Sequence, residues 1–278
     1  MRAPRFFIVC SLSLAFGPGA RAQLAEGGAR ALALGRAATA LGGEVWGQFN
    51  PATWSTLEHR TAALFASRAF GLSETTLAAL AAAAPTRWGT PAVTARTYGF
   101  EDYRETHLGV GFARALPLSP TRRLHVGLHV RYDGVSIPGF GSKGAVGLSA
   151  GALVQVTGAV QAGLHARNLT RLAVSDSASL EASLATAPAL AVGLAYRPTP
   201  RALLVLDAEK DLDFPLAVRG GVEVFPVEVL ALRVGAASAP VRFSAGVGVR
   251  TGPLRADVAV ERHETLGLTP AVALGVEF

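Results

Sequence analysis

The stretch that decides the fold is "LHVGLHVRY", residues Leu124 to Tyr132, in which apolar residues alternate strictly with His, Gly and Arg. Because successive side chains of a β-strand point to opposite faces, one face of this strand is apolar and the other is polar. The same alternation recurs in "VQAGLHAR" (160–167), "VRFSAGVGVR" (241–250), "LRADVAVE" (254–261) and "AVALGVEF" (271–278). The pattern therefore predicts β-strands along most of the chain.

The length and apolarity of these strands indicate a membrane barrel. The chain is 50% hydrophobic, with a mean hydropathy of +0.35. After the N-terminus no run approaches the roughly 18 to 20 apolar residues of a membrane helix, while strands of about 9 to 12 residues suit a tilted membrane strand. An open sheet edge would leave backbone groups unpaired in lipid, so we predict a closed all-β antiparallel transmembrane barrel of about 14 strands between His59 and Phe278.

A soluble β-sandwich or solenoid would also alternate, but its outward face should carry many Lys, Glu, Ser and Thr. The polar face here is rich in Gly, Ala, Arg and His, which suits a crowded and hydrated lumen. Tight turns such as 117–120 and 252–253 alternate with longer stretches such as 136–143 and 170–186. We therefore expect tight turns at one end of the barrel and longer loops at the other.

Residues 1–22 have the features of a cleaved signal peptide. Arg2 and Arg5 precede an apolar stretch at 6–16, and Ala20-Arg21-Ala22 is an A-x-A cleavage site. Cys10, the only cysteine, lies inside this segment, so no disulfide or cysteine metal site is expected after cleavage. Removing three arginines lowers the net charge from +6 to +3 (23 basic minus 20 acidic residues). The basic residues are scattered, which argues against a nucleic-acid partner.

Residues 23–58 differ from the rest of the chain. They are rich in Ala and compatible with a helix up to Leu41, where Gly42-Gly43 ends the pattern. The segment is too short for a domain, so we expect it to act as a hatch, or plug, inside the barrel formed by 59–278. The residues expected to fix the hatch or meet a ligand are Trp46, Phe49, Asn50, Pro51, Ala52 and Trp54.

Charged and histidine residues on the polar face are expected to line the lumen. A calcium site is not expected, because carboxylates spaced along an extended strand, such as Asp207 to Asp213, do not converge on one point. His125 and His129 lie four strand residues apart, about 13 Å, too far for one metal ion. No metal and no cofactor are therefore predicted. The expected lumen residues are His125, His129, Arg131, Asp207, Glu209, Arg219, Glu223, Arg242 and Arg250.

Two motifs associated with enzymes occur in the wrong context. Gly147 to Gly151 matches the nucleophile elbow G-x-S-x-G, but it lies inside an uninterrupted strand pattern rather than at a strand-to-helix turn. Gly139 to Gly144 matches G-x-G-x-x-G, but it lies between two predicted strands and reads as a hairpin loop. The sequence therefore predicts no enzymatic activity.

The order of these features resembles a known family. A signal peptide, "GARALALGRAATAL" (28–41), "NPA" (50–52) and many alternating strands resemble the PorV/PorQ family of outer-membrane barrels, which is itself similar to the FadL-type transporters of hydrophobic compounds. Shorter stretches that also resemble that family are "APTRWG" (84–89), "YGFEDYRE" (98–105), "IPGFGS" (137–142) and "ARNLT" (166–170).

The resemblance implies a bacterial outer-membrane barrel of about 14 strands, embedded in outer-membrane lipid, with an N-terminal hatch. It also implies that the last strand is the signal read by the barrel-assembly machinery. The residues of that signal are Val272, Leu274, Val276 and Phe278.

Two functions follow from the resemblance. The first is a link to type IX protein secretion or cell-surface protein handling, in which the loops 136–143 and 170–186 contact secretion-system proteins or secreted cargo. The alternative is a FadL-like transporter of hydrophobic small molecules. Its ligand would meet Trp46, Phe49 and Trp54 in the hatch and leave sideways through a strand irregularity.

Overall fold

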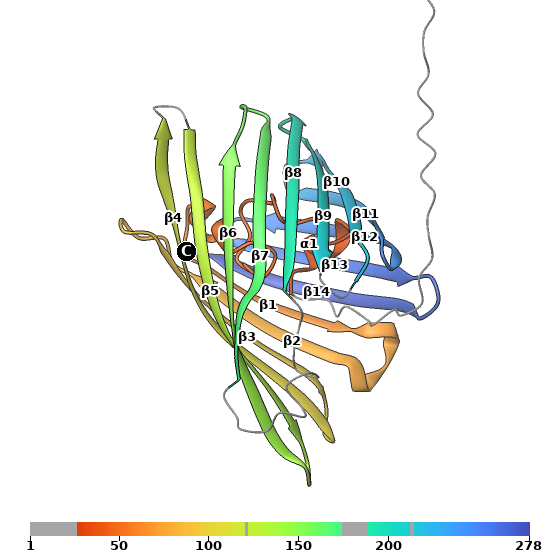
Figure 1. Cartoon of the computed structure of the whole chain (residues 1–278). Coiled ribbons are helices and arrows are strands. Elements are labelled where there is room, and N and C mark those ends of the chain that lie inside the picture. The colour runs from red at the N-terminus through yellow and green to blue at the C-terminus, as the bar shows by residue number, and fades with distance from the viewer. Residues whose placement is uncertain (1–26, 120–121, 174–187, 212–213) are drawn as a thin grey trace, which may run out of the picture.

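The computed structural model describes residues 27–119, 122–173, 188–211 and 214–278. They form a closed barrel of fourteen antiparallel strands in sequential order, so the predicted fold class is confirmed (Figure 1). The predicted signal peptide, 1–22, and most of the predicted loop 170–186 lie outside the described residues. The strands are β1 Thr61–Arg68, β2 Thr76–Ala83, β3 Thr90–Phe100, β4 Tyr103–Ser119, β5 Arg122–Ile137, β6 Gly141–Gln155, β7 Val160–Ala173, β8 Ala189–Thr199, β9 Ala202–Asp211, β10 Ala217–Val227, β11 Leu230–Ser238, β12 Val241–Thr251, β13 Leu254–His263 and β14 Gly267–Glu277.

The barrel closes where the first strand pairs with the last. β1 and β14 are antiparallel over seven residue pairs, from Thr61 opposite Glu277 to Ser67 opposite Ala271. Closure gives both edge strands hydrogen-bond partners, as backbone groups require in lipid. None of the helices among the described residues is long and apolar enough to cross a membrane.

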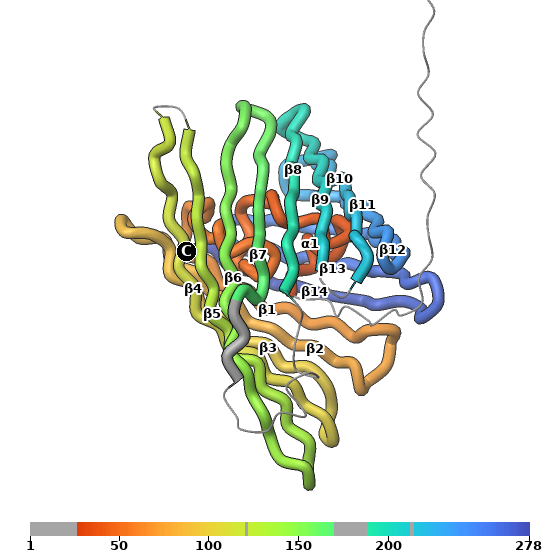
Figure 2. Tube along the Cα trace, viewed as in Figure 1, coloured from red at the N-terminus to blue at the C-terminus, as the bar shows by residue number. Residues whose placement is uncertain are grey.

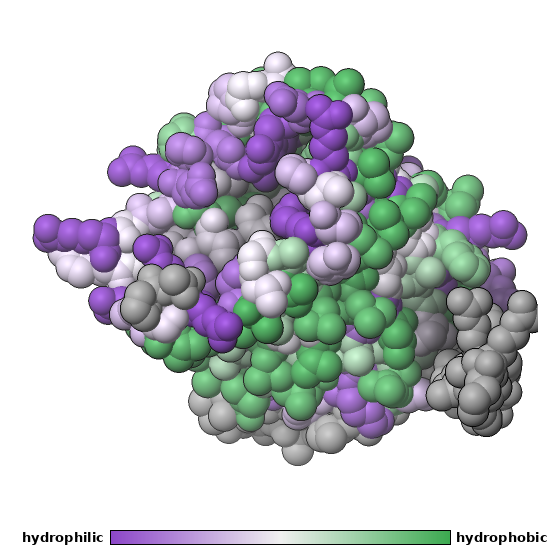
Figure 3. All heavy atoms as spheres, turned by 90° about the horizontal axis from the view of Figure 1, so that it is seen from above, coloured by the Kyte–Doolittle hydropathy of each residue, from purple (hydrophilic) through white to green (hydrophobic). Residues whose placement is uncertain are grey.

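Side chains alternate between the two surfaces as the sequence predicts. In β14, Val272 and Leu274 point outward with 48% and 60% of their surface exposed, whereas Ala271 and Ala273 point inward and are buried. Viewed from the end that carries the connection 156–159, hydrophobic residues gather on the outer wall and hydrophilic ones at the hairpin tips (Figure 3). This distribution is that of a transmembrane barrel, whose outer face contacts lipid.

The connections between strands differ at the two ends. The end at which β1 begins, here the short-turn end, has two-residue connections at 120–121, 200–201, 228–229 and 252–253. The opposite end, here the loop end, has the longest connection, 174–188, together with two-residue turns at 101–102 and 239–240. The longest connection thus lies at the end where longer loops were predicted. Short turns, however, occur at both ends, so tight turns and longer loops are not fully separated.

Two length predictions are wrong. Strands β4 to β7 have 14 to 17 residues rather than 9 to 12, because adjacent strands stay paired beyond the rest of the wall. The predicted helix up to Leu41 is also too long, since α1 spans only Ala29–Ala33. Gly35 and Arg36 have φ values of +68° and +65°, so the helical path ends there.

Residues 27–57, here the N-terminal segment, pack against the inner surface of the barrel (Figure 2). Besides α1, the segment contains the 3-10 helix η1 (Pro51–Thr56); two further 3-10 turns, η2 (Ala69–Gly71) and η3 (Ser73–Thr75), connect β1 to β2. Glycines of the wall make room for it. A Cβ on Gly235 of β11 would lie 2.1 Å from the Gly35 nitrogen, and one on Gly127 of β5 would lie 2.4 Å from the Pro51 carbonyl carbon. Wall and segment are therefore in backbone contact at these points.

The lipid-facing assignment predicts a depth-dependent cost of charge. Val258→Arg places a guanidinium in the middle of β13 on the outer face, where the side chain is 59% exposed. We expect it to lower the free energy of unfolding by about 2–4 kcal/mol, against about 0–1 kcal/mol for the matched control Leu254→Arg at the strand end. Urea unfolding in phospholipid vesicles measures both. Equal costs at the two positions would contradict the assignment.

Candidate functional site in the barrel lumen

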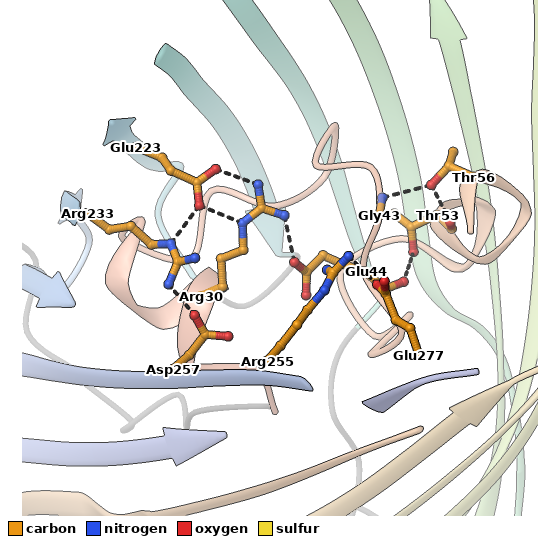
Figure 4. A network of polar contacts seen from close by, with 10 residues as sticks. All are labelled: Arg30, Gly43, Glu44, Thr53, Thr56, Glu223, Arg233, Arg255, Asp257 and Glu277. Carbon is orange, nitrogen blue, oxygen red and sulfur yellow. Dashed lines mark hydrogen bonds and ion pairs between the residues drawn. The ribbon is translucent and has the colours of Figure 1, made fainter. Parts of the chain in front are cut away.

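A buried ion network holds the start of the N-terminal segment to the barrel wall (Figure 4). Arg30 of α1 donates two hydrogen bonds to Glu223 of β10, at 2.8 and 2.6 Å, and one to Glu44 at 2.9 Å. Arg233 of β11 also donates to Glu223, at 2.6 Å, and to Asp257 of β13, at 2.5 Å. Glu223 has no exposed side-chain surface, so two guanidiniums neutralise a carboxylate that is removed from water.

Burial acts on the two ionisable groups that the segment brings to this network. Burial lowers the pKa of Arg30, but attraction to Glu223 and Glu44 outweighs it, so that the pKa is raised overall and the guanidinium stays charged. Burial raises the pKa of Glu44, and the nearby Arg30 opposes this shift. The Arg30–Glu44 pair lies within the segment, whereas the Arg30–Glu223 pair joins the segment to the wall.

Further contacts continue along the segment. Arg36 pairs with Glu261 of β13 through bonds of 3.0 and 2.8 Å. The backbone N–H of Thr39 donates to Asp207 of β9 at 2.8 Å. The N–H of Gly35 donates to the Ser244 hydroxyl of β12 at 3.0 Å. The first part of the segment is therefore bonded to strands on one side of the barrel, from β9 to β13.

Asn50 bonds the second part of the segment to other strands. Its side-chain amide donates to the carbonyls of Thr39 at 2.7 Å, Ala152 of β6 at 3.1 Å and Leu164 of β7 at 3.3 Å. Its side-chain oxygen accepts from the N–H of Ala52 at 3.0 Å, which caps η1. A Cβ on Gly151 would lie 1.9 Å from this oxygen, so only glycine fits opposite Asn50.

The two tryptophans of the segment have different surroundings. Trp54 is fully buried, donates its indole N–H to the Val45 carbonyl at 2.7 Å and lies edge-on to His129 at 5.3 Å. Trp46 is 6% exposed and lies edge-on to Phe65 of β1, with ring centroids 5.9 Å apart. Phe49 is partly buried against a separate cluster of apolar residues. Of these three predicted ligand-facing aromatics, Trp46 is the one that lines the two cavities described below.

The predicted lumen charges lie at different depths. His129, Asp207, Glu209, Arg219, Glu223 and Arg242 are buried, His125 and Arg131 are half-buried, and Arg250 is exposed at the end of β12. Several form ion pairs across strands, such as Arg219 with Glu209 at 2.9 Å. His125 bonds the Ser55 hydroxyl at 2.7 Å. No group of acidic and histidine side chains suited to a metal ion occurs within the described ranges.

Sequence reasoning missed several network members. Arg30, Arg36 and Glu44 belong to the segment, and Asp133 pairs with Arg131 at 2.6 Å and with His107 at 2.5 Å. Strand parity could have found Asp133, since it shares a face with His129 and Arg131. No local signal marks the charges of the segment.

The residues of the predicted assembly signal lie in and after β14. Val272 and Leu274 point outward, Val276 is half-buried, and Phe278 is 69% exposed. The backbone N–H of Phe278 donates to the Arg60 carbonyl at 2.9 Å, which brings the last residue beside the start of β1.

Two cavities border the N-terminal segment. One, of about 320 Å³, opens at the short-turn end and is lined by residues of the segment together with β8, β10 to β14 and β1. The other, of about 40 Å³, lies toward β2 to β5. The walls of the larger cavity combine apolar side chains, such as Val45, Phe225 and Ala273, with the charges of the ion network.

Comparisons with known proteins identify the fold. The chain matches no protein-family profile and no curated protein sequence. It is similar in structure to the Pseudomonas putida toluene transporter TodX, with a TM-score of 0.64, 11% identity, and 91% of this chain and 96% of that chain covered. It is also similar to the Ralstonia pickettii toluene transporter TbuX, with a TM-score of 0.65, 11% identity, and 92% of this chain and 99% of that chain covered. A Pseudomonas aeruginosa FadL homologue matches with a TM-score of 0.57, 12% identity, and 90% of this chain and 97% of that chain covered.

These similarities define the class of fold: a 14-stranded barrel like those of FadL-type outer-membrane transporters. They support the FadL-type part of the resemblance seen in the sequence. They give no support to the PorV/PorQ part or to a link with type IX secretion. Two of these neighbours are named as transporters, and none of the three is named as an enzyme.

The ion network predicts that Glu223 fixes the segment. Glu223→Gln leaves Arg30 and Arg233 without their shared carboxylate, and breaking a buried pair costs about 3–5 kcal/mol. We expect trypsin to cleave the segment faster in folded barrels of this variant. The matched control is Glu228→Gln, because Glu228 is exposed in the β10–β11 turn. Unchanged protection in Glu223→Gln would show that the network does not hold the segment.

The bonds of Asn50 predict a second effect. Asn50→Ala removes four hydrogen bonds and leaves buried polar groups without partners, at about 1–3 kcal/mol each. We expect this variant to pass small neutral solutes faster than the wild type in liposome-swelling assays. Ser55→Ala, which loses its bond to His125, serves as the control with a smaller effect. Equal swelling of Asn50→Ala and wild type would refute the prediction.

Proposed function

We propose that this protein is a non-enzymatic outer-membrane channel for small hydrophobic molecules, in which the N-terminal segment acts as a hatch. The observation that carries the proposal is the closed 14-strand barrel, similar in fold to two toluene transporters, with a segment bearing aromatic side chains bonded across its lumen. A secretion-linked role, the first reading of the sequence, has no such observation behind it.

The size and chemistry of the larger cavity fit such a ligand. An apolar cavity of about 150 Å³ is enough to bind benzene, so 320 Å³ has room for a substituted monoaromatic or a short alkyl chain. The apolar side chains Val45, Trp46 and Phe225 would contact the ligand, while the charges of the ion network beside them (Arg30, Glu44, Glu223, Arg233 and Asp257) are paired with each other. Burying apolar surface there drives binding without a charged partner on the ligand.

The proposal includes an orientation. The short-turn end, at which β1 begins and β14 ends, would face the periplasm, and the loop end would face outward, as in other outer-membrane barrels. Export would use the signal peptide 1–22, and insertion would use the last strand with Phe278 as its terminal aromatic. Outer-membrane lipid would cover the apolar outer wall.

The sideways exit expected from the sequence requires an irregularity in the wall, and the described strands contain a candidate, whose suitability depends on the polar groups around it. Between β6 and β7 the register shifts, so that Leu148 opposes Thr170 while Ala150 opposes Ala166. Asn168 in this bulge has φ +53° and is buried. The pairing of β7 with β8 also ends nearby, at Arg167 opposite Ala189.

The transport proposal predicts faster hydrocarbon entry. Cells whose outer membrane contains the protein should take up radiolabelled toluene severalfold faster at low concentration than cells that carry an unrelated barrel of similar size. Native mass spectrometry of the protein, extracted in mild detergent, should show a stoichiometric hydrophobic ligand on the barrel. Equal uptake together with an empty barrel that co-purifies with secreted proteins would favour the secretion-linked function instead.

A further inference from the structure

The side chain of Trp46 lies between the two cavities described above. Trp46 lines both the cavity of about 320 Å³ at the short-turn end and the cavity of about 40 Å³ toward β2 to β5. In the described part of the chain it is the single residue common to the two linings. A solute moving from the small cavity to the large one would therefore meet the indole ring.

The ring is held by apolar contacts and not by hydrogen bonds. It lies edge-on to Phe65 and against the backbone of Gly27 and Gly28, where an added Cβ would come within 2.9 and 2.8 Å of indole atoms. No hydrogen bond joins the Trp46 indole N–H to the residues that the structure describes. Trp54, by contrast, is bonded through its N–H to Val45. Trp46 can therefore turn without breaking a polar contact.

The backbone around Trp46 lies between the two bonded parts of the segment. Residues 30–39 are bonded to β9, β10, β12 and β13, and Asn50 is bonded to β6 and β7. Between them, Gly43 and Gly47 have φ values of +75° and +60°, and no atom lies within 4 Å of a Cβ placed on Gly43. Gly43 has open space around it and can change conformation, whereas Gly47 packs against the Trp54 ring and marks the end of the stretch that can move.

The polar contacts of Gly43, Glu44 and Val45 described below are with other residues of the segment. The N–H of Gly43 donates to the Thr56 hydroxyl at 2.8 Å, and Glu44 pairs with Arg30 at 2.9 Å (Figure 4). The carbonyls of Glu44 and Val45 accept bonds from Thr53 and Trp54. The hydrogen bonds that Arg30, Arg36, Thr39 and Asn50 make with the wall lie outside this stretch, so movement of Trp46 would leave them intact.

The bulge at Asn168 is less suited to an apolar solute. Its buried N–H faces the Ser149 hydroxyl at 3.4 Å, and its side-chain oxygen faces Arg131 at 3.5 Å. An apolar molecule there would separate buried polar groups from their partners, which is unfavourable. At Trp46 the same molecule would replace one apolar contact by another.

We infer that Trp46 sets the size limit for solutes that pass through the lumen between these two cavities. This inference rests on the proposed function and adds a route and a selectivity residue to it. Shortening the side chain joins the two cavities, and the gap grows with the volume removed. The expected order of permeability is Trp46→Ala above Trp46→Phe above wild type.

Liposome swelling with neutral solutes of graded size tests the inference on the full-length folded barrel. We expect Trp46→Ala to swell at least about tenfold faster than wild type with the smallest solutes, because a constriction controls the flux. Its cut-off should also be larger, with Trp46→Phe between the two. Trp88→Ala is the matched control, since Trp88 is 62% exposed in the β2–β3 turn, and it should behave as wild type.

Two results would overturn the inference. One is a folded Trp46→Ala barrel, verified by its heat-dependent gel mobility, that swells like wild type. The other is a Trp46→Ala barrel that passes the same sizes as Asn50→Ala and loses trypsin protection of the segment, because the whole segment would then have moved. Toluene uptake by wild-type cells separates the two proposals. If wild-type cells take up toluene but the size cut-off in liposome swelling does not depend on Trp46, only this inference is contradicted. If the size cut-off depends on Trp46 but wild-type cells do not take up toluene, only the proposal of a hydrophobic substrate is contradicted.

Discussion

Backbone hydrogen bonding in lipid is the constraint on which the rest of the structure depends. A strand in the hydrocarbon core cannot bond to water, so each N–H and C=O needs a neighbouring strand. The pairing of β1 with β14 supplies the last set of partners and turns a sheet into a cylinder. Once closed, the wall fixes which side chains face lipid and which face the lumen. The alternation of Leu, Val and Phe with Gly, Ala, Arg and His follows from this requirement.

A closed wall creates a second requirement, because inward-facing polar groups must be satisfied in a narrow space. Here arginine and carboxylate pairs such as Arg219–Glu209 and Arg233–Glu223 connect neighbouring strands. The same carboxylates bind the N-terminal segment, since Glu223 accepts from Arg30 as well as from Arg233. Buried ion pairs add little net stability, but an unpaired member is costly. The network therefore specifies one position of the segment more than it strengthens the barrel.

How far the sequence predicts this structure depends on the range of each interaction. Strand alternation is local, so the fold class and the outward residues Val272 and Leu274 could be predicted. The inward position of Asp207 and Glu223 follows from the same period of two. The pairing of Arg30 with Glu223 joins residues 193 positions apart and leaves no trace in either neighbourhood. The early end of α1 at Ala33 precedes the contacts of Gly35 with β11 and β12, and the bulge at Asn168 depends on contacts with β5 and β6, so neither could be predicted from the residues around it.

The N-terminal segment is bonded to residues that lie far from it in the sequence, and this sequence separation bears on the order in which the structure forms. The segment precedes β1, but its partners Asp207, Glu223 and Glu261 belong to β9, β10 and β13. Contacts between residues so far apart in sequence form late, because the chain between them must first be ordered. Synthesis from the amino terminus also produces the segment before the strands that bind it. The segment consequently remains without its partners until the carboxy-terminal strands have formed. Its binding to the inner wall is therefore among the last steps of folding.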